Sequence, residues 1–79
     1  MEEEIKKEKI YGFRVNFKKT DKKGFYYLRK DLQKEEAKTL LEAAKLRGRA
    51  EFEDDQDRDW TLLYDKRERT FTLLRRQRE

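Results

Sequence analysis

The most chemically suggestive stretch of this chain combines aromatic and basic side chains. Residues 23–30 read Lys-Gly-Phe-Tyr-Tyr-Leu-Arg-Lys, and the lysine-rich residues 18–23 lead into them. Aromatic rings that project from a β-sheet can stack on unpaired nucleic-acid bases, while neighbouring cations neutralise phosphates. If residues 25–30 form a strand, this stretch predicts a surface that binds single-stranded nucleic acid.

The same stretch partly resembles the first consensus of the RNA-recognition motif, which Lys23, Gly24 and Phe25 match. In that family the consensus lies on a strand after the first helix, whereas here it precedes the only helix that the sequence predicts. The family is therefore not assigned. The competing interpretation places these rings in the hydrophobic core, because hydrophobic residues make up only 34% of the chain and a few large rings must fill its interior.

The predicted nucleic-acid site combines two aromatic rings with the cations around them. Its candidate residues are Arg14, Lys18, Lys19, Lys22, Lys23, Phe25, Tyr27, Arg29, Arg75 and Arg76. About four to six phosphate contacts would give a slope of log K against log salt of roughly −3 to −5. The alternative is that these cations only keep a small domain in solution.

Composition excludes most catalytic chemistry. The 79 residues include no serine, histidine, cysteine or proline, while Lys, Arg, Asp and Glu make up 51%. The chain therefore has no conventional catalytic triad, no histidine–cysteine zinc site and no side chain whose unperturbed pKa lies near neutrality. We expect a binding protein rather than an enzyme, without a cofactor or a metal.

One acidic segment, residues 51–59, has features of a metal site. Three aspartates at alternate positions from Asp55 copy the opening of a calcium-binding loop. However, Trp60 stands where an EF-hand requires glycine, and Lys66 stands where its bidentate glutamate belongs. These departures exclude an EF-hand, and we interpret the segment as a polar turn.

Hydrophobic periodicity predicts the elements that position these residues. Apolar side chains alternate along residues 10–17, which is typical of a half-buried strand, and residues 25–30 would form the second strand of a hairpin. Residues 31–47 change to helical spacing, and Gly48 is suited to end the helix. Three further strands are expected at residues 49–53, 60–65 and 70–75.

The predicted fold is α+β with the order ββαβββ, a single helix packed on one face of a mostly antiparallel sheet. One domain is expected over residues 1–79. It comprises a charged N-terminus at 1–9, a folded unit at 10–75 and a basic tail at 76–79. The predicted core contains Phe13, Val15, Phe17, Leu28, Ala37, Leu40, Leu41, Ala44, Phe52, Trp60, Leu62, Phe71 and Leu73, with Tyr11 and Tyr26 at its margin.

Charge is distributed unevenly around the net value of +4. Residues 1–30 carry ten basic and five acidic side chains, whereas residues 49–59 carry two basic and six acidic ones. The expected partner is nucleic acid, with single strands favoured. The alternative is a protein that docks on the open sheet face or on an edge strand, as an interaction module or an inhibitor-like regulator.

Other expectations concern location and origin. The chain has no apolar run long enough for a membrane span, and its acidic start differs from the basic start of a signal peptide. A cytoplasmic protein that has no membrane partner is therefore expected, as a monomer or as a homodimer through an edge strand. A third hypothesis is an engineered scaffold without natural function, because dense surface charge is also typical of designed and thermophilic proteins.

Overall fold

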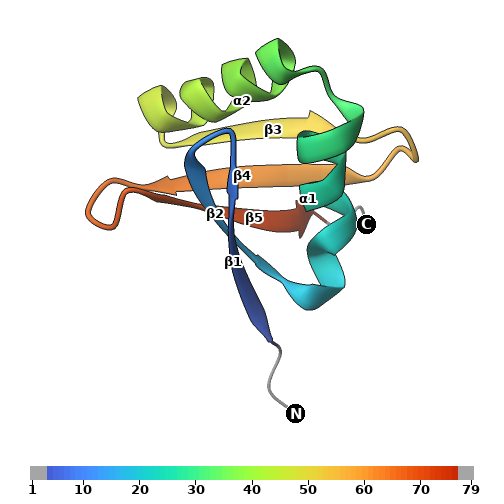
Figure 1. The fold of residues 1–79 in the computed structure, drawn as a ribbon, viewed down its shortest axis with the longest axis horizontal. Helices are drawn as coiled ribbons and strands as arrows, with labels where there is room; N and C mark the ends of the chain where they lie inside the picture. The colour runs from blue at the N-terminus through green and yellow to red at the C-terminus, as the bar shows by residue number, and fades with distance from the viewer. Residues whose placement is uncertain (1–3, 77–79) are drawn as a thin grey trace.

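The computed structural model describes residues 4–76. Its five-stranded sheet has the strand order β1-β2-β5-β4-β3, and helices cover one face (Figure 1). Neighbouring strands are antiparallel except β2 and β5, which pair in parallel over three positions. The predicted α+β class is confirmed, with helical residues packed on a sheet, but two helices replace the single helix that was expected.

Helical residues form two connected arms between the second and third strands. The first arm, residues 19–31, is continuous and lies near the start of β4, whereas α2 runs beside β3 (Figure 1). The elements are β1 (Ile5–Ile10), β2 (Phe13–Lys18), the 3-10 turn η1 (Lys19–Asp21), α1 (Lys22–Tyr26), the π-helical turn η2 (Tyr27–Asp31), α2 (Lys34–Arg47), β3 (Arg49–Glu53), β4 (Asp59–Asp65) and β5 (Thr70–Arg76).

Residues 25–30 are helical, and the prediction of a second strand there is wrong. Phe25 and Leu28 are buried three residues apart, which is the spacing of one helix face. Gly24 permits this packing, because a Cβ atom at that position would lie 2.6 Å from the Trp60 ring. The error arises because a short apolar run does not by itself distinguish a strand from a helix.

The second strand of the N-terminal hairpin comes from earlier in the chain. Residues 5–9, expected in a charged terminus, form most of β1, and Tyr11 and Gly12 make a two-residue turn into β2. Both turn residues have positive φ, 49° and 89°, as a type I′ hairpin turn requires. The sequence does not reveal β1 as a strand, because most of its residues are charged and Ile10 is its only fully buried residue.

The helix α2 ends as the sequence predicts. Gly48 adopts a left-handed conformation with φ 91°, and its N–H donates to the Ala44 carbonyl at 2.7 Å. The helix begins at Lys34, later than the predicted residue 31, since the first arm continues to Asp31. Within residues 4–76, the helices are too short and too polar to cross a bilayer.

The core lies between the sheet and the helices. The predicted core residues Phe13, Leu40 and Phe52 are only partly buried and pack at its edge. Ile10 and Phe25 belong to the core although the sequence does not predict them, whereas Tyr11 and Tyr26 are exposed. The predicted core residues that are buried are Val15, Phe17, Leu28, Ala37, Leu41, Ala44, Trp60, Leu62, Phe71 and Leu73.

Candidate nucleic-acid interface

Alternate residues of every strand point away from the helices and form the open face of the sheet. Lys9 lies opposite Arg14 in the β1–β2 pair, and Lys7 lies opposite Asn16. Asn16 is in turn opposite Thr72 of β5, so the polar surface continues across the parallel strand pair. We call this surface the basic half, and its residues are Lys7, Lys9, Arg14, Asn16, Thr70 and Thr72.

The three cations of the basic half lie close together in space. Lys7 and Lys9 are two residues apart on one strand, a spacing of roughly 6.6 Å, and Arg14 is on the adjacent strand. All three side chains are exposed, and no carboxylate within residues 4–76 forms an ion pair with them. Neighbouring like charges repel each other, so this arrangement favours an anionic ligand.

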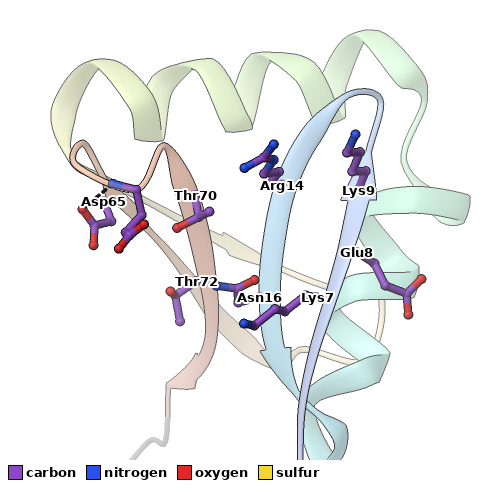
Figure 2. A pocket seen from close by; sticks show the side chains of 9 residues that line it. Lys7, Glu8, Lys9, Arg14, Asn16, Asp65, Thr70 and Thr72 are labelled. Carbon is purple, nitrogen blue, oxygen red and sulfur yellow. Dashed lines mark hydrogen bonds between the residues drawn. The ribbon is translucent and has the colours of Figure 1, made fainter.

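The basic half lines a hollow of about 620 Å³. Lys7, Arg14 and Asn16 point into the space between β2 and β5, where the two threonine hydroxyls also lie, whereas Glu8 points away (Figure 2). Asp65, on the opposite side, accepts hydrogen bonds from the Arg67 and Glu68 amides at 2.9 and 3.2 Å. Its carboxylate therefore closes the β4–β5 turn.

On the other side of the open face, the cations form ion pairs with a carboxylate of the chain itself. Arg49 lies 3.3 Å from Glu51, and Arg76 of β5 forms an ion pair with the same carboxylate. We call these three residues the paired half. Arg75 faces the opposite side of the sheet, with its guanidinium 6.0 Å from the centre of the Trp60 ring. The predicted cluster of Arg75 and Arg76 is therefore divided between two faces of the sheet.

The remaining predicted cations are also dispersed. Lys18 shares the open face with Arg14, but Lys19, Lys22 and Lys23 lie in η1 and α1, within the helical layer. Arg29 forms an ion pair of 3.6 Å with Glu8 of β1. Of the predicted cations, Arg14 lines the hollow, and Lys18 lies further along the same strand, β2.

Lys7 and Lys9 are the functional candidates that sequence reasoning missed. A local signal for them is Tyr11-Gly12, a glycine-containing pair suited to a two-residue hairpin turn, whereas residues 5–10 show no alternation of apolar and polar side chains. Recognition of that turn would have paired residues 5–10 with β2. It would also have placed both lysines on the same face as Arg14.

The proposed stacking rings are not on the open face. Phe25 is completely buried and stacks on Phe17, with ring centres 4.3 Å apart and an angle of 19°. Tyr27 is half-buried and stacks on Phe52 at 6.0 Å. Burial, followed by nearby carboxylates such as Asp55, raises the pKa of the Tyr27 phenol. The placement of a base-stacking platform at residues 25–27 is therefore wrong.

The acidic segment is organised around one buried carboxylate. Asp54 Oδ1 accepts hydrogen bonds from the Gln56 and Arg58 amides at 2.8 and 3.0 Å. Its Oδ2 accepts from Arg58 Nε at 2.6 Å and from Trp60 Nε1 at 2.9 Å. Burial raises the pKa of Asp54, but these hydrogen bonds outweigh it and lower the pKa to about 2. The Asp54 carboxylate at the start of the β3–β4 loop thus holds that loop in its folded conformation.

Comparison with protein-family models, with curated proteins and with solved structures finds no match for this chain. The chemistry of the open face is therefore the basis for a functional proposal. That face offers three cations without an ion-pair partner among residues 4–76, beside two hydroxyls and an amide. These are the groups that proteins commonly use to contact phosphate and sugar. The hollow is also lined by Glu8 and, at its β4–β5 end, by Asp65 and Glu68.

Proposed function

We propose that this protein binds nucleic acid through the basic half of its open face, chiefly by contacts to the phosphate backbone. The observation that supports the proposal is the exposure of Lys7, Lys9 and Arg14 side by side, without an acidic partner among residues 4–76. Cations that neutralise phosphates release counterions, which supplies most of non-specific binding.

The groups beside the cations fit the same ligand. Asn16, Thr70 and Thr72 can donate hydrogen bonds to phosphate oxygens and sugars, and such contacts orient a strand without reading its sequence. Strand residues that face this side between positions 5 and 76 include no aromatic side chain. The open face therefore contacts the backbone, and its binding is largely independent of base sequence.

A protein partner that adds a strand to the sheet has less support. Both edge strands carry exposed charged residues along their length, including Lys7 and Lys9 of β1 and Glu51 of β3. Charged side chains on an edge strand oppose pairing with another chain. Self-association through an edge strand meets the same obstacle.

The test is fluorescence anisotropy with labelled oligonucleotides at about 50 mM salt. The variant Lys7→Gln, Lys9→Gln, Arg14→Gln removes three positive charges from the basic half. The control Lys34→Gln, Lys38→Gln, Arg47→Gln removes three from α2, on the opposite layer. We expect micromolar affinity for the wild type, at least a ~10-fold loss in the first variant and at most a ~2-fold loss in the control.

Two results would overturn the proposal. The first is an absence of binding by the wild type at tens of micromolar protein. The second is an equal loss in the two triple variants, which would show that net charge rather than the basic half determines affinity. Circular dichroism of both variants checks that each retains its fold.

A further inference from the structure

A notch lies where the two hairpins of the sheet separate. The parallel pairing of β2 with β5 starts at Val15 and Phe71, so Phe13 and the turn at residues 66–69 lie beyond it. The notch has a volume of about 450 Å³, within the range of small-ligand pockets. Its lining shares Arg14 and Glu68 with the hollow of the basic half, so the two spaces adjoin.

Aromatic rings form the apolar part of the notch. Phe71 is almost fully buried, and the rings of Phe13 and Tyr64 pack against it at 5.7 and 4.8 Å. Phe13 and Tyr64 are themselves only partly buried, so each leaves part of its ring accessible. These two rings come from different hairpins: Tyr64 lies opposite Phe71 in the β4–β5 register, whereas Phe13 lies two residues before Val15, the β2 residue opposite Phe71. A flat aromatic ligand could contact both.

The polar part of the notch is mainly cationic. Arg14, Lys45 and Arg69 line it, and none of them forms an ion pair with a carboxylate in residues 4–76. Glu68 is the single carboxylate of the lining, and carboxylates accept hydrogen bonds from the exocyclic amino groups of bases. Aromatic surface beside several cations suits a ligand with both a planar ring and a phosphate.

We propose that the notch holds one unpaired nucleotide of the strand that binds the basic half. The base lies against Phe13 and Tyr64, and its phosphate lies near Arg14, which joins the notch to the hollow. This inference rests on the proposed function and adds the substrate class, single-stranded nucleic acid, because bases in a duplex are already stacked and paired.

The experiment compares a single-stranded oligonucleotide with an abasic strand of the same length. Both carry the same phosphates, so their affinity ratio reports base contacts alone. We expect the wild type to bind the strand with bases about 10-fold more tightly. Tyr64→Leu keeps an apolar side chain against Phe71 and should bring the ratio towards 1, while affinity for the abasic strand is unchanged.

Two further variants test the assignment. Tyr64→Phe retains the ring and should retain the ratio. Tyr26→Leu removes a tyrosine that is 44% exposed in the helical layer and should leave the ratio unchanged. If Tyr64→Leu does not fold, Phe13→Leu applies the same test from the other side of the notch.

The outcomes separate the two proposals. Equal affinity of the wild type for both strands overturns the notch but leaves backbone binding in place. A loss of the ratio in Tyr26→Leu as large as that in Tyr64→Leu also overturns the notch. Failure of the wild type to bind either strand overturns the proposed function and the notch together.

Discussion

The two halves of the open sheet face hold similar cations in different circumstances. In the paired half, Arg49 and Arg76 both contact Glu51. In the basic half, Lys7 and Lys9 lie beside Arg14 without a carboxylate partner among residues 4–76. The number of cations in a segment therefore does not identify a binding surface. Their position relative to the chain's own carboxylates does.

The same contrast extends to the carboxylates. On the β3–β4 side, acidic groups serve the fold, and Asp54 accepts four hydrogen bonds from its own loop and from Trp60. Across the sheet, the Glu8 carboxylate points away from the hollow (Figure 2) and forms an ion pair with Arg29. The acidic loop therefore serves stability, whereas the basic hairpin has the cations that we propose contact a ligand.

The largest expected effect concerns the contribution of the Asp54 carboxylate to stability. Asp54→Asn removes the charge that bonds Arg58 and Trp60, so the free energy of unfolding should fall by about 3 kcal/mol in urea denaturation at pH 7. Asp55→Asn, an exposed neighbour, is the control and should change it by less than about 0.5 kcal/mol. Equal effects would contradict a special role for Asp54.

Protonation of Asp54 at low pH should reproduce part of this loss of stability. The pKa of Asp54 is lowered from 3.8 to about 2, so ionisation contributes about 2 kcal/mol of stability, which is complete above about pH 5. That contribution is lost as the pH falls through 3.8 towards 2. The difference in stability between the wild type and Asp54→Asn should therefore shrink between pH 7 and pH 2.5. A constant difference would contradict the assigned cause.

The smallest expected effect comes from a substitution that leaves the cations of the paired half without their carboxylate, as in the basic half. Glu51→Gln removes the carboxylate that occupies Arg49 and Arg76, so oligonucleotide affinity should rise about 3-fold, while stability changes by less than about 1 kcal/mol. Glu42→Gln on α2 makes the same change in net charge away from the open face. Anisotropy measures both variants, and an equal gain in the control would contradict the comparison.

The sequence predicts the elements that follow regular spacing. Helix α2 ends at Gly48 as expected. The last three strands lie close to their expected positions at residues 49–53, 60–65 and 70–75. Prediction from the sequence fails where contacts between distant residues determine the secondary structure. Phe25 lies in a helix because Gly24 lets that helix pack closely against Trp60. Gly24 and Trp60 are 36 positions apart, so local sequence patterns do not predict their contact.

Prediction of the candidate site was limited by the same cause. Arg14 is found by strand periodicity alone, because it alternates with the buried residue Val15. Its neighbours Lys7 and Lys9 are not, since β1 buries only Ile10 completely and so has little hydrophobic signal. The pairing of Arg76 with Glu51 depends on the order of strands in the sheet, which the spacing of residues does not specify.

The most direct test of backbone binding by the basic half is the salt dependence of affinity for a single-stranded oligonucleotide. Three lost phosphate contacts, at about 0.7 each, should reduce the magnitude of the slope of log K against log salt by about 2. We predict this reduction in the Lys7→Gln, Lys9→Gln, Arg14→Gln variant and an unchanged slope in the α2 control. Equal slopes for the wild type and the first variant would contradict it.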